Sequence, residues 1–459
     1  MHLNKKIKRR FKLIIGSLFA QFAVPLSNIG VSILVVRWFS EELWGRYVAH
    51  LLVLGLCLTI INWGSKDFLL KRFSKHPKNI SEVLWAAILG KTVLAILTCL
   101  CLYFLPLGTL NKPLLVCWVG ARVGWQFFES LNTYRRLFVP VAIAEGVFVA
   151  GMMTGMVFLE MTIDLLLLFF ILTDILKIFF YAWLNRAYLK WPTSSSLRLD
   201  QKGKSEGGSW KSEVGSWKSE RGRGKLEGGS EKSEVGSGKG RASGVFFRLG
   251  LLTNLRQLAW PTKAVNVAAF FKESFPFFLL TIASLAASRA DLYLLGIWKD
   301  NATLAQYQIL VSFIQYAHLL ATAMMIPFLK NIFRLEFKSI AQLERQFMAL
   351  GAVLAIFLTG GILFITYFLY QFELSKMVIL LIYLNILIFY SYFLRIPAGF
   401  SFDKMWQVIL IMCAMGAINL SLGCLIIPSL GMLGGLLSSL GASVIGCAGF
   451  RHKKLFNFQ

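Results

Sequence analysis

Four polar residues follow one another at helical spacing inside a long apolar stretch of the chain. Arg122, Gln126, Glu129 and Thr133 are separated by four, three and four positions, so on a continuous α-helix they form one stripe. An ionised side chain in the middle of a bilayer costs about 2.5–3.5 kcal/mol even on lenient scales. The stripe must therefore face protein or water. We expect it to line a hydrated cavity; bonding to neighbouring helices is the structural alternative.

A second group of ionisable residues lies in a later apolar stretch. Arg289 and Asp291 are two positions apart, which places them on different faces of a helix and excludes a direct intrahelical pair. At least one of them must face another helix or a ligand. A purely structural role, holding two parts of the molecule together, is equally open.

Weaker polar stripes recur in three other apolar stretches. Each alone is ordinary bonding between helices, but together they predict a polar interior. Their members are Ser17, Gln21, Asn28 and Ser32 in the first stretch, Thr59, Asn62 and Lys66 in the second, and Gln308, Ser312, Gln315 and Thr322 in the eighth. Lys66 and Lys91 can instead extend to the membrane surface. Asp174 and Lys177, three positions apart, are expected to neutralise each other.

The balance of these charges favours an anionic ligand. Arg122, Arg289, Lys66 and Lys91 outnumber Glu129 and Asp291, and Arg binds phosphate oxygens bidentately. An exporter of cations would instead need isolated carboxylates.

Enzyme motifs are missing from the sequence. Gly90-Lys91-Thr92 resembles the end of a phosphate-binding loop, but Trp85 stands where its first glycine is required. The sequence contains no HExxH. All seven cysteines lie in apolar runs, so we expect neither disulfides nor a metal site. We predict a protein that is not an enzyme and holds no cofactor.

The composition identifies the elements that must position these residues. The chain has 459 residues, of which 56% are hydrophobic and 15% charged, too apolar for a soluble protein of this length. Continuous apolar runs of about 20 residues can each cross a bilayer as a helix. We predict an all-α membrane protein of twelve transmembrane helices in two six-helix lobes. The predicted spans are 12–36, 46–69, 83–105, 113–133, 138–159, 164–185, 273–297, 304–328, 347–369, 377–396, 405–427 and 430–450.

The predicted domain organisation has four parts. Residues 1–189 form the N-terminal lobe, and 272–459 form the C-terminal lobe. The segment 190–244 is rich in Gly, Ser, Lys and Glu, with seven-residue repeats such as GSWKSEV and GSWKSER. Because Gly recurs in every repeat, we expect a disordered linker rather than a coiled coil. Residues 245–271 are expected to form a basic amphipathic segment on the membrane surface.

The net charge of +25 does not indicate a nucleic-acid partner, because that requires a basic surface on a folded soluble domain. Most Lys and Arg lie in connections on the N-terminal side of the membrane. The opposite side has only Arg37, Arg46, Lys112, Lys299 and Lys376. This asymmetry predicts an inner (cytoplasmic) membrane protein with both termini in the cytoplasm and basic residues near anionic lipids.

Two stretches resemble a known family. The segment Val36-Arg37-Trp38-Phe39-Ser40-Glu41-Glu42-Leu43-Trp44-Gly45-Arg46-Tyr47 is similar to an "R-x-L-G-P-E-E-F-G-x-Y" turn, with Phe39-Ser40 in place of Leu-Gly. Ser274-Phe275-Pro276, Ser288-Arg289-Ala290-Asp291 and Leu295-Gly296 resemble "S-x-P... R-x-D... L-G". Both patterns are typical of the polysaccharide transporters in the multidrug/oligosaccharidyl-lipid/polysaccharide exporter superfamily, specifically the O-antigen or capsule repeat-unit flippases.

The resemblance implies a bundle that alternates access and moves an undecaprenyl-diphosphate-linked oligosaccharide, an O-antigen, capsule or exopolysaccharide repeat unit, to the periplasmic leaflet. It adds Arg37 to the candidate residues, beside Arg289 and Asp291. With no nucleotide site, we expect ion flow or the membrane potential to drive the cycle, with a proton or sodium as the coupling ion. A polysaccharide polymerase and chain-length proteins are expected partners. The alternatives are a multidrug or cation exporter of the same superfamily and a membrane glycan polymerase or ligase. The last is disfavoured because every predicted outer connection is short.

Overall fold

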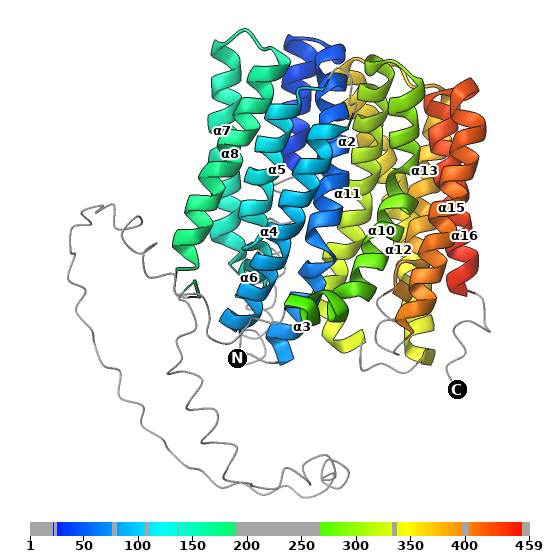
Figure 1. Cartoon of the computed structure of the whole chain (residues 1–459). Helices are drawn as coiled ribbons and strands as arrows, with labels where there is room; N and C mark the ends of the chain where they lie inside the picture. The colour runs from blue at the N-terminus through cyan, green and yellow to red at the C-terminus, as the bar shows by residue number, and fades with distance from the viewer. Residues whose placement is uncertain are drawn as a thin grey trace, which may run out of the picture. The chain divides into compact units, whose positions relative to one another are not determined.

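The computed structural model describes residues 22, 25–75, 80–105, 110–135, 137–186, 188–189, 267–332, 337–396 and 404–451. Within these ranges every regular element is a helix (Figure 1). Seven of these helices are long and apolar enough to cross a membrane. The chain is therefore a multi-pass, all-α membrane protein, as its composition predicts.

Helices occupy all six predicted spans of the N-terminal half. The first is described only over 25–38. The others are α2 (Glu41–Asn62), α4 (Ile80–Phe104), α5 (Lys112–Gln126), α7 (Phe138–Phe158) and α8 (Ile163–Leu184), with the shorter α3 (Ser65–Lys75) and α6 (Glu129–Tyr134) between them. Ser40, Asn111 and Thr162 cap α2, α5 and α8 by accepting the backbone N–H three residues later, which satisfies a donor that has no partner inside the helix.

The described residues of the C-terminal half, 267–332, 337–396 and 404–451, form six long helices. They are α10 (Val267–Trp298), α11 (Asn301–Ile332), α12 (Phe337–Ile365), which continues into the π-helical turn η3 (Thr366–Tyr370), α13 (Lys376–Tyr392), α15 (Met405–Leu430) and α16 (Met432–Arg451). Because α10 begins at Val267, the last five residues of the predicted surface segment 245–271 belong to this helix. The predicted linker 190–244 lies outside the described residues, as does Gln21.

Two helices of the N-terminal half end earlier than their apolar runs indicate. α2 stops at Asn62 because Trp63 and Gly64 take left-handed backbone conformations, with φ of 46° and 61°. A Cβ on Gly64 would lie 2.3 Å from the backbone carbon of Phe277 on α10, so only glycine fits this close approach. The prediction of one span over 46–69 is therefore wrong at its end: the chain turns and restarts as α3.

A second break lies in the predicted span 113–133. α5 ends at Gln126, and α6 begins at Glu129 after Phe127 and Phe128. Arg122 and Gln126 thus share one helix, whereas Glu129 stands on another. The expectation of one continuous four-residue stripe is wrong for this reason.

The two halves pack directly against each other. α2 of the first half lies along α11 of the second, and α3 and α4 contact α10. One large apolar core includes buried residues of both halves, such as Val48 and Trp118 with Leu292 and Leu310. The packing of α2 on α11 positions the cavity described next.

Candidate functional site: a polar cavity between the two halves

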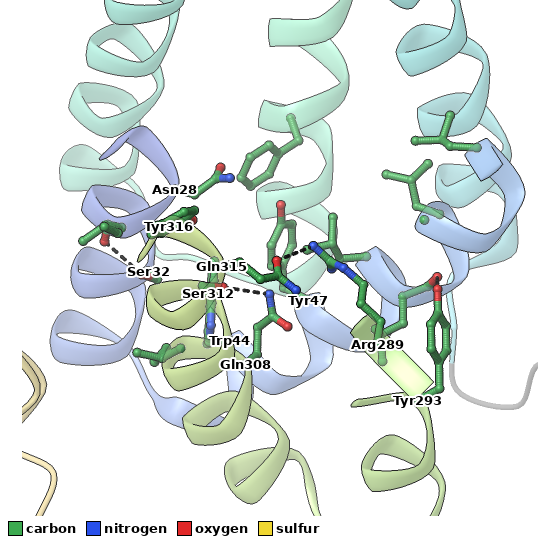
Figure 2. Close-up of a pocket in the computed structure, with 18 of the residues that line it drawn as sticks. Asn28, Ser32, Trp44, Tyr47, Arg289, Tyr293, Gln308, Ser312, Gln315 and Tyr316 are labelled. Carbon is green, nitrogen blue, oxygen red and sulfur yellow. Dashed lines mark hydrogen bonds between the residues drawn. The ribbon is translucent and has the colours of Figure 1, made fainter. Parts of the chain in front are cut away.

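A cavity of about 400 Å³ lies between the halves, lined by helix 25–38, α2, α5 and α8 on one side and α10, α11 and η3 on the other (Figure 2). This volume is in the range of small-molecule sites in proteins. Its polar wall consists of Asn28, Ser32, Thr59, Arg122, Arg289, Gln308, Ser312 and Gln315, together with the aromatic residues Trp44, Tyr47, Trp118, Tyr293, Tyr316 and Tyr370. Both halves therefore contribute hydrogen-bonding groups.

Arg289 is the cation of the cavity whose charge is not balanced. It lies on α10 and points toward Gln315 on α11, with Nη2 donating to Gln315 Oε1 at 2.9 Å (Figure 2). Within the described ranges no carboxylate lies within 4.0 Å of its guanidinium. A guanidinium bonded to one neutral amide keeps most of its donors for a ligand, and it favours an anionic one.

Arg122, on the other side of the cavity, belongs to an ion-pair network inside the N-terminal half. Its Nη1 donates to Asp174 Oδ1 at 3.1 Å, and the Trp118 indole donates to Asp174 Oδ2 at 3.1 Å. Behind them, Lys177 lies 2.7 Å from Glu145. The two positive charges of this network, on Arg122 and Lys177, cancel the two negative charges, on Asp174 and Glu145. Arg289 therefore determines the sign of the net charge at the cavity.

The predicted pairing of Asp174 with Lys177 is present, at 3.9 Å. Each of them nevertheless has a closer partner on another helix: Arg122 for Asp174 and Glu145 for Lys177. The sequence reasoning missed Glu145, which stands alone among apolar residues of α7 without a charged neighbour at helical spacing. The network joins α5, α7 and α8 and is a structural feature of this half.

Asp291 does not line the cavity. It is buried on another face of α10, where Tyr307 Oη donates to Oδ2 and Asn419 Nδ2 donates to Oδ1 at 3.4 Å. The structure brings it together with α11 and α15, not with Arg289. Its predicted place among cavity ligands is thus corrected. The described part of the chain contains four buried carboxylates, and of these Asp291 alone has no cation within 4.0 Å.

Four further predicted residues form a separate group with Lys91. Asn62 Nδ2 donates to Gln126 Oε1 at 2.9 Å, and Lys91 Nζ donates to Asn62 Oδ1 at 3.2 Å. Lys66 Nζ and Glu129 Oε1 form an ion pair at 2.6 Å. We call Asn62, Lys66, Lys91, Gln126 and Glu129 the inner polar cluster. None of its members lines the cavity, which corrects the expectation that they do.

The remaining predicted residues divide between the cavity and its surroundings. Asn28 and Gln315 line the cavity, and Asn28 bonds to the Tyr316 hydroxyl. Arg37 is exposed near the end of helix 25–38 and is not part of the wall. Its predicted place among the candidate cavity residues is corrected accordingly.

Sequence reasoning did not find the aromatic part of the wall. Tyr370 and Ser32 bond through their hydroxyls at 2.5 Å, which joins η3 to helix 25–38, and Tyr293 Oη donates to the Leu52 carbonyl at 3.0 Å. An aromatic residue in an apolar run looks the same in sequence whether it faces lipid, core or a cavity. Tyr47 and Trp44 carried a signal, because both stand in the first family-like segment.

The fold matches solved membrane transporters at low sequence identity. The lipid II flippase MurJ in an inward-closed conformation aligns with a TM-score of 0.59 and 14% identity, over 96% of this chain and 86% of that one. A eukaryotic MATE transporter aligns at 0.55 and 11%, over 96% and 94%. The Vibrio cholerae MATE transporter VcmN aligns at 0.52 and 13%, over 96% and 94%. No family model and no curated protein matches the sequence. The chain therefore has the fold of these transporters.

Proposed function

We propose that this protein is a flippase that moves an undecaprenyl-diphosphate-linked oligosaccharide across the cytoplasmic membrane by alternating access. The observation that carries the proposal is Arg289, a cation without a nearby carboxylate in a cavity shared by both halves. A diphosphate that leaves water needs charged donors of this kind. The surrounding amides, hydroxyls and aromatic rings are the groups that bind sugar hydroxyls and sugar faces.

Contacts on either side of the cavity support alternating access. At one end Gln306 Nε2 on α11 donates to Glu41 Oε2 at the start of α2 at 2.9 Å. At the other end the ring of Trp63 stacks on Phe278 of α10 with 3.8 Å between ring centroids. Both contacts join one half to the other. If the contact at one end breaks while the contact at the other end is kept, the cavity opens to one side of the membrane at a time.

The charge of the wall disfavours the alternative, export of drugs or cations. None of the residues that line the cavity is Asp or Glu. Asp174, which bonds to Arg122 of the wall, is already neutralised by that pairing. A cationic ligand would therefore meet an unbalanced guanidinium and no opposite charge.

Asp291 is the residue that we assign to the coupling ion, a proton or sodium. A buried carboxylate whose hydrogen-bond partners are all neutral groups is costly when ionised, so a bound cation or a proton stabilises it. Asn419 Oδ1 beside it is buried and has no hydrogen-bond partner in the described structure. Asp291 stands two residues after Arg289 on α10, which links ion binding to the cavity wall.

The proposal includes the orientation that the basic connections predict. Both termini lie in the cytoplasm, and the substrate enters from the cytoplasmic leaflet. Anionic membrane lipids contact the basic connections on that side of the membrane. A polysaccharide polymerase and chain-length proteins would receive the product at the other side. The protein itself breaks no covalent bond.

The test is translocation of a fluorescent lipid-linked diphosphate sugar in sealed vesicles that contain the purified full-length chain. Arg289→Met should lower the initial rate at least about tenfold, the value of one charge-assisted hydrogen bond. Arg289→Lys should retain part of the initial rate, because lysine keeps the positive charge. Arg46→Met is the matched control, because Arg46 is exposed and pairs with Glu42 within α2. An Arg289→Met rate equal to that of the control contradicts the proposal.

A further inference from the structure

The inner polar cluster continues the wall of the cavity toward the end of the bundle that holds α3 and α6 (Figure 1). Thr59 on α2 and Arg122 on α5 line the cavity. Asn62 follows Thr59 by three residues, and Gln126 follows Arg122 by four, so the cluster begins about one helical turn, or about 5.4 Å, beyond the wall. A column of polar side chains thus connects the cavity with that end.

Lys91 is the central residue of this column and is nearly inaccessible, with 3% of its surface exposed. Its one hydrogen-bond acceptor in the described part of the chain is Asn62 Oδ1. The ring of Phe127 lies 5.8 Å from Nζ, and no described carboxylate lies within 4.0 Å of it. An ammonium carries three donors, so most of its hydrogen-bonding capacity is unused.

The burial of Lys91 does not increase the stability of the fold. Burying a charge without a close opposite partner is costly, and one neutral amide recovers only a part of that cost. In α4 an apolar residue of similar volume would pack without this cost. Ionisable groups kept at membrane depth against such a cost mark the paths of substrates and ions.

The outer boundary of the column is a contact that can open. Lys66 on α3 and Glu129 on α6 form an ion pair in which 56% and 38% of the side chains are exposed. An ion pair as exposed as this contributes little to stability. It stands where both helices restart after their breaks, so small rotations of α3 or α6 separate it. An incoming anion can replace the Glu129 carboxylate as the partner of Lys66.

We propose that Lys91, with Asn62, Gln126 and Lys66, forms a loading site for the phosphate groups of the lipid headgroup, separate from the Arg289 cavity. This inference rests on the proposed function and names a second station for the same substrate. The headgroup exchanges the Lys66–Glu129 pair for its own contact with Lys66, then binds Lys91, and moves one turn further to reach Arg122 and Arg289. The loading site determines the affinity for the lipid headgroup, whereas the cavity determines the rate at which the protein changes from one side of the membrane to the other.

The first arm of the test measures binding of inorganic pyrophosphate to the full-length chain by isothermal titration. An Arg289→Met background removes the cavity's unbalanced cation, so that the remaining binding reports the loading site. Adding Lys91→Met should weaken pyrophosphate binding about tenfold, and Lys91→Arg should restore it. Lys112→Met is the control, because Lys112 is only half-buried and lies at the other end of α5, where its Nζ donates to the Tyr103 carbonyl. Unchanged affinity in Lys91→Met overturns the proposal.

The second arm measures translocation against the density of lipid-linked substrate. Lys91→Met should raise the half-saturating density about tenfold and change the maximal rate less than about twofold. Glu129→Gln, which removes the competing carboxylate, should lower the half-saturating density. A loss of maximal rate at unchanged half-saturation in Lys91→Met overturns the proposal. Because Glu129 is accessible, its variant keeps the test decisive if Lys91→Met fails to fold.

The two arms separate this inference from the proposed function. If pyrophosphate binding depends on Lys91 but no translocation occurs in the unmodified chain, the loading site stands and the flippase function falls. If translocation depends on Arg289 but neither binding nor half-saturation depends on Lys91, the flippase function stands and the loading site falls.

Discussion

Two ion pairs of the network that joins α5, α7 and α8, Arg122–Asp174 and Lys177–Glu145, should differ in their contribution to stability, because only the first of them borders the cavity. Glu145 and Lys177 are both buried, with 4% and 8% of their side chains exposed. In the other pair Asp174 is buried, but 25% of the Arg122 side chain is exposed, toward the cavity. Removing one carboxylate therefore leaves a buried ammonium in one case and a hydrated guanidinium in the other.

The expected magnitudes follow from this difference. Glu145→Gln leaves Lys177 without its close partner and should reduce the free energy of unfolding by about 3–5 kcal/mol, the usual cost of breaking a buried pair. Asp174→Asn should cost about 1–3 kcal/mol, because cavity water can solvate Arg122. The asparagine also keeps an oxygen that accepts from the Trp118 indole.

The assay is reversible unfolding in mixed micelles, followed by tryptophan fluorescence, with both variants measured in the same detergent and lipid. The same samples give a second readout. Asp174→Asn frees Arg122, so inorganic pyrophosphate should bind this variant more tightly than the unmodified chain, whereas Glu145→Gln should leave pyrophosphate affinity unchanged. If Asp174→Asn costs as much stability as Glu145→Gln, or if it does not tighten binding, Arg122 is not hydrated by the cavity and the reasoning is refuted.

Two further predictions follow from the described contacts. Gly64→Ala should prevent stable folding, because its Cβ would lie 2.3 Å from the Phe277 backbone; Gly120→Ala, with no atom within 4 Å of the new Cβ, is the control, and equal yields of monodisperse protein would contradict the close approach. Asp291→Asn should abolish the dependence of translocation on a proton or sodium gradient and leave pyrophosphate affinity intact, as measured in vesicles with imposed gradients. Retained gradient dependence would remove Asp291 from the coupling role.

The fold was largely predictable because the membrane imposes a simple rule on the sequence. A run of about 20 apolar residues must form a helix there, so the predicted spans agree with the helices to within a few residues at most ends. The breaks at Trp63–Gly64 and Phe127–Phe128 were not visible. Both occur inside apolar runs, and what ends the helix at Gly64 is the approach of α10, which is distant in sequence.

The candidate site was predictable only in part. Helical spacing correctly placed Arg122 and Gln315 toward the interior, since spacing determines which residues share a face. Spacing cannot say how deep a residue lies or which helix it meets. For that reason Asn62, Lys66, Gln126 and Glu129 were assigned to the cavity, although they lie beyond it. Asp291 was grouped with Arg289 by sequence, yet it faces α11 and α15.

The central claim is that the unbalanced charge of Arg289 binds the diphosphate of a lipid-linked sugar between the two halves. The most direct measurement is an experimental structure of the full-length chain in a lipid nanodisc with an undecaprenyl-diphosphate-linked oligosaccharide. We predict that the diphosphate density lies within hydrogen-bonding distance of Arg289, with sugar rings against the aromatic wall. Substrate bound elsewhere, with the cavity filled only by water and Arg289 still bonded to Gln315, would contradict this account.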